Sequence, residues 1–365
     1  MNVLKLTRIG LLGFACFAAG STSLFGQDGP PSGHDYAIVL DDVLLRPGVM
    51  VDLHLQVFVN DRKPCVGRTI LAVPGFAHTA ATFGPLAAAM FGGGPAGQAA
   101  CRVVAVDFPG HGATPAPTGM AFGYLMLPDY VTALLASLER LPSYGVHADF
   151  LLAHSQGGLV VQLAQQRLAA AGTSLRAAFN VRDAVLLAPV PPKEVRWEFA
   201  DSGFAVIVLQ SLSAIVMADP VLGPHVALPD AAWTPVFFSN LAGVVAPDAP
   251  SAADVVANGY NAPEPLLSAL ELIGALHLAG FDPTPRPSIQ AGIFGAESGT
   301  LLQIVTFAED PIVRSAEGAQ TYAHLAGDAS GSGLVDVAGT FSMHDLYVSN
   351  PAALLDAIAG VIRLR

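Results

Sequence analysis

The chain has 365 residues, of which 52% are hydrophobic and only 13% are charged, about half the charged share of a typical soluble domain. Its formal net charge is −12 at pH 7, and its 17 Lys and Arg residues form no basic cluster, which excludes a nucleic-acid partner. The high apolar content, together with 37 Gly and 28 Pro, indicates a folded, loop-rich protein and excludes a disordered one.

The first 26 residues have the three-part pattern of a secretory signal peptide. A basic start over residues 1–8 is followed by an apolar core at 9–19 and then by small residues. Such a core is too short to span about 30 Å of hydrocarbon, so a membrane anchor is the weaker alternative. A lipid anchor on Cys16 is another alternative, although the residues before Cys16 are a poor lead-in for one. We therefore expect an exported protein with a signal peptide at 1–26 and a mature domain at 27–365.

An antiparallel hairpin is predicted at the start of this domain. Apolar and polar residues alternate over 36–45 and again over 50–59, on either side of a turn containing Pro47 and Gly48. From residue 66 to 189, short apolar runs then alternate with helical patterns. This alternation is typical of a parallel sheet covered by helices on both faces. The predicted helices lie at about 79–91, 128–140 and 157–171.

The alternation stops between residues 190 and 290, where prolines are frequent and no strand pattern is visible. This segment contains two apolar stretches, at 204–218 and 265–281. Because a loop of this length without secondary structure is improbable in a compact domain, we expect a helical cap inserted after the sixth strand. The strand pattern resumes at residue 301, and the chain ends with a predicted helix over 351–364.

A strand-to-helix connection at residues 153–158 carries the sequence Ala-His-Ser-Gln-Gly-Gly. An apolar run precedes it and a helical pattern follows it. A serine among small residues at such a junction is the layout of a nucleophile elbow, a strained turn that exposes the serine hydroxyl. For this hexapeptide alone, an ordinary glycine-rich connection is the alternative. The elbow hypothesis makes Ser155 the candidate nucleophile.

Two further residues of a catalytic triad follow predicted strands near the C-terminus. Asp310 and His344 come after the apolar runs 301–307 and 334–338, which gives the chain order Ser155, Asp310, His344. In a triad the histidine takes the serine proton and the acid orients the histidine. The neighbouring Glu309 is the alternative acid, and Asp336 is a more remote third candidate.

These motifs together resemble those of the α/β-hydrolase family, in particular its cap-bearing serine hydrolases. The chain departs from the family pattern at Pro74, where a histidine is usual, and at Ala153, which replaces the first elbow glycine. Neither change removes a backbone donor. The resemblance implies an α/β fold with a mostly parallel eight-stranded sheet, an N-terminal hairpin and a cap at about 190–290. It covers residues 66–365 and is strongest at 73–76, 106–112, 154–158, 309–312 and 343–345.

The resemblance also implies further site residues. The backbone N–H groups of Phe76 and Gln156 are expected to form an oxyanion hole, which stabilises the negative charge of a tetrahedral intermediate. Phe76 and His78 are candidate substrate-binding residues. Three other polar residues near these motifs are interpreted as structural: Asp107, His111 and His154.

The function implied in this way is hydrolysis of a carboxylic ester, a small molecule with an apolar acyl group, by a secreted enzyme that needs no metal and no organic cofactor. The same triad serves carbon–carbon bond hydrolases, lactonases, amidases and acyltransferases, which remain alternatives. A hydrolase-like binding protein without catalysis is a weaker alternative, because all three triad positions are filled. No oligomeric state is predicted.

Two cysteines remain once the signal peptide is removed. Cys65 and Cys101 each stand at the start of a predicted strand, and in this fold the two strands are expected to be adjacent and parallel. In an exported protein such a pair is a candidate disulfide, with two unpaired thiols as the alternative. Neither has the spacing of a metal site to another Cys or His, so no zinc site is predicted.

Overall fold

The computed structural model of the protein describes residues 35–60, 68–75, 78–92, 100–115, 127–198, 286–308, 310, 312–328, 331–337, 344 and 351–358. The predicted signal peptide, Cys65 and residues 199–285 of the predicted cap lie outside these ranges. The cap and the bond between Cys65 and Cys101 therefore stay predictions.

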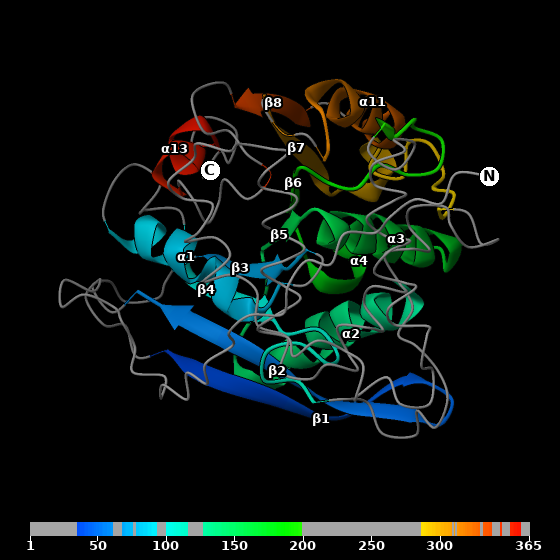
Figure 1. Ribbon diagram of the computed structural model, residues 1–365. Coiled ribbons are helices and arrows are strands. Elements are labelled where there is room, and N and C mark those ends of the chain that lie inside the picture. The colour runs from blue at the N-terminus through cyan, green and yellow to red at the C-terminus, as the bar shows by residue number, and fades with distance from the viewer. Residues whose placement is uncertain are drawn as a thin grey trace, which may run out of the picture. The chain divides into compact units, whose positions relative to one another are not determined.

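Eight strands form one sheet in the spatial order β1-β2-β4-β3-β5-β6-β7-β8 (Figure 1). The pairs β1–β2 and β2–β4 are antiparallel, and every pair from β4 to β8 is parallel. The predicted mostly parallel sheet with an N-terminal hairpin is thus confirmed. The strands are β1 Tyr36–Arg46, β2 Val49–Val59, β3 Arg68–Val73, β4 Ala100–Val106, β5 Phe150–His154, β6 Asp183–Leu187, β7 Leu301–Phe307 and β8 Gly333–Val337.

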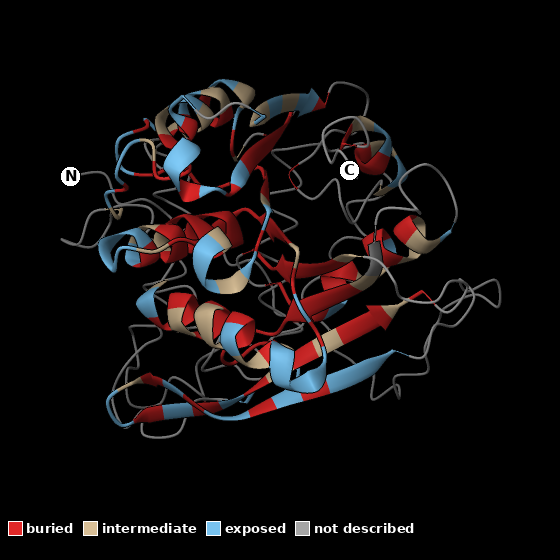
Figure 2. Ribbon diagram, turned by 180° about the vertical axis from the view of Figure 1, so that it is seen from behind, coloured by how far each residue is buried: buried red, intermediate tan, exposed pale blue. Residues whose placement is uncertain are grey.

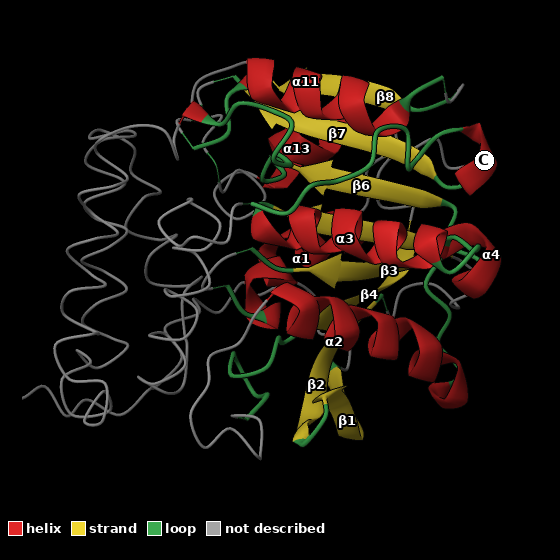
Figure 3. Cartoon of the chain, turned by 90° about the vertical axis from the view of Figure 1, so that its right-hand side faces the viewer, coloured by secondary structure: helices red, strands yellow, loops and turns green. Residues whose placement is uncertain are grey.

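Helices cover both faces of the sheet (Figure 3). Helices α1 and α13 pack with one apolar core, and α2, α3 and α11 pack with the other. In the described ranges, no helix is both long and apolar enough to cross a bilayer. The helices are α1 Gly84–Phe91, α2 Leu127–Arg140, α3 Gln156–Ala170, α4 Leu175–Phe179, α11 Ser315–Ala326 and α13 Pro351–Ile358, and short 3-10 helices lie at Ala80–Phe83, Leu141–Tyr144 and Ala296–Ser298.

The central strands are buried on both faces, as the red ribbons of Figure 2 show. Along β3, Ile70 and Ala72 belong to the core under α1, whereas Leu71 and Val73 belong to the core under α3. Because successive strand residues point to opposite faces, a strand covered on both sides must be apolar throughout. This requirement explains the uninterrupted apolar runs of the sequence.

The predicted helices at 79–91, 128–140 and 157–171 agree with the structure, as does the described part, Pro351–Ile358, of the helix predicted over 351–364, but α11 was not predicted. The carboxylate of Glu317 accepts a hydrogen bond from the backbone N–H of Arg314 (2.9 Å) at the start of this helix. Burial raises the pKa of the Glu317 carboxyl. The next residue, Gly318, lies against Thr306 of β7, where a Cβ atom would clash with the threonine methyl group. The packing of this helix on β7 therefore determines its position more than its own apolar pattern does.

Candidate active site

Ser155 lies in the turn between β5 and α3, where the sequence predicted a strained elbow. Its backbone has φ 49° and ψ −116°, a conformation that non-glycine residues rarely adopt. Its N–H donates to the carbonyl oxygen of Leu187 on β6 (2.9 Å), which ties the turn to the neighbouring strand. The residue is 6% exposed. The carboxyl ends of parallel strands, where this turn lies, are the usual ligand-binding edge of such sheets.

Small residues let the elbow pack tightly against the end of β3. A Cβ atom at Gly157 would clash with the carbonyl oxygens of Val73 and Pro74. A Cβ atom at Gly75 would lie 2.7 Å from Nδ1 of His154 and 3.2 Å from Cβ of Ser155. Each of these glycines thus makes room for the other segment.

His344 and Asp310 form a buried pair. Nδ1 of His344 is 2.7 Å from Oδ2 of Asp310, whose residue is only 3% exposed. The other carboxylate oxygen, Oδ1, accepts hydrogen bonds from the backbone N–H groups of Ile312 (2.7 Å) and Val313 (3.0 Å). Since a carboxylate only accepts, Nδ1 of His344 carries the proton in this pair.

A third histidine joins this pair to the elbow. Nε2 of His154 donates to the carbonyl oxygen of His344 (2.9 Å), and the two ring centroids are 4.6 Å apart. On its other side the His154 ring stacks on His78, with centroids 5.2 Å apart. Because His154 directly precedes Ser155, this bond brings the backbone of His344 to the elbow. The three rings form a short row, and the middle one belongs to the residue directly before Ser155.

Burial, followed by repulsion from His344 and His78, lowers the pKa of His154 well below its ordinary value of 6.5. The neutral ring is therefore the form that fits this position. It keeps Nε2 as the donor to the His344 carbonyl.

Acidification is expected to weaken the fold through His154. The unfolded chain binds a proton at His154 at higher pH than the folded chain does, so the stabilising contribution is present above about pH 6.5 and is lost as the pH falls below it. His154→Gln keeps a side-chain N–H donor but does not titrate. Thermal unfolding between about pH 8 and pH 5 should show a larger loss for the wild type than for the variant. Equal losses would contradict the role of His154.

The structure describes only part of the predicted oxyanion hole. Gln156 is the first residue of α3 and is buried. The first N–H groups of a helix have no partner within it, so they can donate to an anion. Phe76, the second predicted donor, lies outside the described residues, as does Glu309, the alternative acid.

Asp107 and His111 were interpreted as structural, and their contacts agree with that interpretation. The Asp107 carboxylate accepts hydrogen bonds from the backbone N–H groups of Ala80 (2.6 Å) and Ala113 (2.9 Å) and lies 3.1 Å from Nδ1 of His54. Nδ1 of His111 is 3.0 Å from the carbonyl oxygen of Pro109. The sequence pattern does not single out His54, because a lone histidine on a strand has no signature.

No group of three or more His, Cys, Asp or Glu side chains that could hold a metal ion is found among the described residues. Near the elbow the described residues include the Ser155 hydroxyl and an imidazole–carboxylate pair, His344 and Asp310, in which the backbone of His344 is bonded to His154. This set can move protons and attack a carbonyl carbon.

Comparison with protein families matches residues 70–357 to the alpha/beta hydrolase family. The chain belongs to this family. A search of curated proteins finds no match.

Solved structures share the fold at low sequence identity. A hydrolase from Pseudomonas aeruginosa aligns over 91% of this chain and 100% of its own, with 16% identity and a TM-score of 0.54. A thermophilic esterase from Thermogutta terrifontis aligns over 90% and 98%, with 14% identity and a TM-score of 0.57. E-2-(acetamidomethylene)succinate hydrolase aligns over 90% and 99%, with 19% identity and a TM-score of 0.53.

Proposed function

We propose that this hydrolase is a serine esterase, which transfers the acyl group of a carboxylic ester first to Ser155 and then to water. The main support is the bond from His154 to the His344 carbonyl (2.9 Å), because it ties the backbone of His344, whose ring pairs with Asp310, to the residue before the strained serine. The alternative, a plain glycine-rich connection, gives no reason for a buried imidazole–carboxylate pair beside this turn.

The proposed mechanism follows from the proton on Nδ1 of His344. With Nδ1 donating to Asp310, the neutral ring has its acceptor at Nε2, which takes the proton of Ser155 as its oxygen attacks the ester carbonyl. Asp310 stabilises the imidazolium that forms. His344 then gives the proton to the leaving alcohol, and a water activated by the same ring releases the acid.

The tetrahedral intermediate needs donors for its negative oxygen. We assign this role to the backbone N–H groups of Gln156 and Phe76, the first because it stands at the start of α3. Phe76 and His78 are proposed to contact the substrate. His78 stacks on His154 and is buried, so any substrate contact would be through a small part of its ring.

Other reactions of the same triad remain alternatives, because fold and triad do not separate esters from lactones, amides, carbon–carbon bonds or acyl transfer to another alcohol. We favour esters since one of the structural neighbours is an esterase. We also propose export of the protein, on the signal-peptide pattern of residues 1–26.

A fluorophosphonate probe and a series of p-nitrophenyl esters test the proposed function. The probe should label the wild type but not Ser155→Ala, while Ser137→Ala, which removes a buried serine of α2, should still be labelled. Esters with acyl chains of a few to about ten carbons should react faster than acetate. Each buried CH₂ contributes up to about 0.8 kcal/mol, or roughly a fourfold gain in kcat/KM.

The two outcomes test separate parts of the proposal. Labelling that persists in Ser155→Ala would remove Ser155 as the nucleophile. If kcat/KM stayed level or fell as the acyl chain lengthened from acetate, the proposed apolar acyl substrate would be rejected, while the esterase assignment would stand. The apolar stretches that motivate the chain-length prediction, 204–218 and 265–281, lie outside the described residues.

A further inference from the structure

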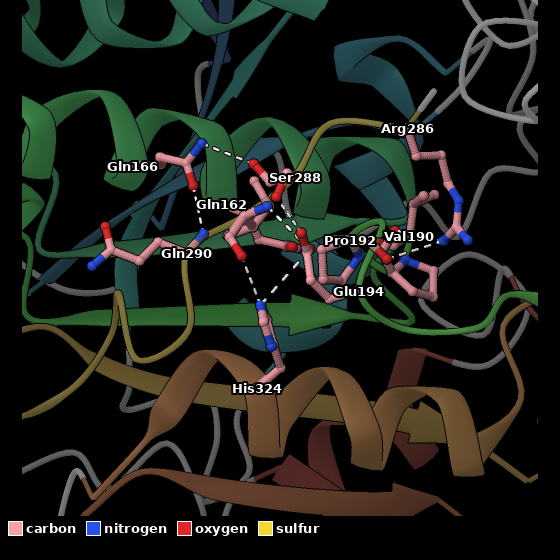
Figure 4. A network of polar contacts seen from close by, with 11 residues as sticks. Gln162, Gln166, Val190, Pro192, Glu194, Arg286, Ser288, Gln290 and His324 are labelled. Atoms are coloured by element: carbon pink, nitrogen blue, oxygen red, sulfur yellow. Dashed lines mark hydrogen bonds and ion pairs between the residues drawn. The ribbon is translucent and has the colours of Figure 1, made fainter. Parts of the chain in front are cut away.

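Two chain segments at the carboxyl edge of the sheet are bonded to each other. Residues 190–198, here the incoming segment, follow β6, and residues 286–290, the outgoing segment, lead back toward β7. Between them the two segments share hydrogen bonds of both backbone and side chains (Figure 4). These bonds join Lys193 to Pro287, Glu194 to Ser288 and Ile289, and Arg286 to Pro191 and Pro192.

Helices α3 and α11 fix the outgoing segment in turn. The side-chain amide of Gln166 on α3 donates to the carbonyl oxygen of Ser288 (2.9 Å) and accepts from the N–H of Gln290 (2.7 Å). Nε2 of His324 on α11 donates to the carbonyl oxygen of Ile289 (2.7 Å). The two segments therefore form one bonded unit on rigid helices.

Trp197 connects this unit to the loop that carries Asp310. Its side chain is almost entirely buried, with the residue 5% exposed, and the guanidinium carbon of Arg286 lies 5.6 Å from its ring centroid. The indole N–H donates a short hydrogen bond to the carbonyl oxygen of Ile312 (2.6 Å). A tryptophan packed in this way presents its donor from a fixed position.

The acceptor of that bond belongs to the peptide group that holds Asp310. The carbonyl of Ile312 and the N–H of Val313 form one planar peptide unit. The indole of Trp197 donates to the oxygen of this peptide unit, and the N–H of the unit, from Val313, donates to Oδ1 of Asp310 (3.0 Å). The other carboxylate oxygen, Oδ2, lies 2.7 Å from Nδ1 of His344. Hydrogen bonds linked through one peptide group polarise and restrain each other.

We propose that Trp197 is a positioning residue, which holds the Ile312–Val313 peptide so that Asp310 keeps its bond to His344. The proposal rests on the proposed roles of Asp310 and His344. It extends them to Trp197, a residue of the incoming segment. The observation that supports the proposal is that one peptide group, Ile312–Val313, accepts from the Trp197 indole N–H at its oxygen and donates to the Asp310 carboxylate from its nitrogen.

Trp197→Phe tests this role, because phenylalanine keeps an aromatic ring beside Arg286 but has no N–H donor. The matched control is Gln166→Leu, which removes two hydrogen bonds from the outgoing segment and leaves the Trp197 bond in place. If Trp197 had a purely structural role, both variants would lose thermal stability and keep the wild-type kcat and His344 resonance. Replacing Trp197 by benzothienylalanine, an isostere whose sulfur takes the place of the N–H, serves if Trp197→Phe does not fold.

Two measurements on the full protein separate the possibilities. The first is the proton resonance of Nδ1–H of His344, which lies far downfield while the bond to Asp310 is short. The second is the division of any kinetic loss between kcat and KM. We expect Trp197→Phe to move or broaden the resonance and to lower kcat roughly three- to tenfold, the worth of about one hydrogen bond, at nearly unchanged KM. Gln166→Leu should change neither.

An unmoved resonance in a folded Trp197 variant would overturn the proposal. A resonance that moves in the Trp197 variant and not in Gln166→Leu supports it, even if the wild type hydrolyses no ester. The proposed function fails if the wild type hydrolyses no ester. The Trp197 proposal fails if the His344 resonance does not move in the Trp197 variant.

Discussion

Replacing Ser155 by alanine is expected to lower kcat by on the order of 10⁴ or more, because the hydroxyl that would carry the acyl group is removed. His344→Ala should be equally damaging, since His344 is the proposed base. Asp310→Asn should be somewhat less severe. Asparagine keeps the shape of the side chain and one oxygen that can accept from Ile312 and Val313, but it loses the charge that stabilises the imidazolium.

Glu309→Gln is the matched control for the acid, because Glu309 is adjacent in the sequence and was its alternative. It should reduce kcat far less than Asp310→Asn does. If Glu309→Gln reduced kcat more than Asp310→Asn, Glu309 would be the acid of the triad. If Ser155→Ala kept a tenth of the wild-type rate on a substrate, Ser155 would not be the nucleophile. Steady-state kinetics with near-ultraviolet circular dichroism of each variant would separate lost chemistry from lost folding.

The sheet was predictable because its central strands are buried on both faces. In β6 a run of apolar residues from Ala184 to Leu187 is what a strand covered on two sides requires. The hairpin was predictable for the opposite reason: β1 lies at the edge of the sheet and alternates buried and exposed residues along much of its length. Both patterns are local in the sequence, so one short window is enough to recognise them.

The contacts that were not predictable join distant backbone groups. Trp197 meets the carbonyl oxygen of Ile312, and any residue could supply that oxygen, so no sequence pattern marks the pair. The same holds for the carbonyl of His344, which accepts from His154. Helix α11 has only two large apolar side chains, Tyr322 and Leu325, and the contact of Gly318 with Thr306 on β7 cannot be seen in either segment alone. Such features depend on the register of the sheet and are fixed only when the chain folds.

Asp107→Ala is expected to have the largest effect on stability. The buried carboxylate of Asp107 lies at the end of β4 and joins three segments. These are His54 on β2 (3.1 Å), Ala80 at the start of the helix after the Gly75 loop (2.6 Å) and Ala113 in the following turn (2.9 Å). Its removal would leave two backbone N–H groups and an imidazole without their acceptor. Each buried polar group that loses its partner costs about 1–3 kcal/mol.

We therefore expect Asp107→Ala to lower the free energy of unfolding by roughly 3–5 kcal/mol, the lower part of the cost of three such losses, because His54 is partly exposed to water. The matched control is Asp336→Ala, since Asp336 on β8 also accepts two hydrogen bonds, from Thr306 (2.8 Å) and Ser315 (2.7 Å), but is exposed. Water can replace the acceptor of the exposed Ser315 bond, and the Thr306 hydroxyl also lies 3.3 Å from the carbonyl oxygen of Val335, so the control should lose less than about 1 kcal/mol. Urea unfolding of both variants measures the difference, and similar losses would mean that the Asp107 carboxylate does not hold these three segments together.

Because Ala80 follows directly on the segment that contains Phe76 and His78, Asp107→Ala should also reduce ester hydrolysis in the protein that remains folded.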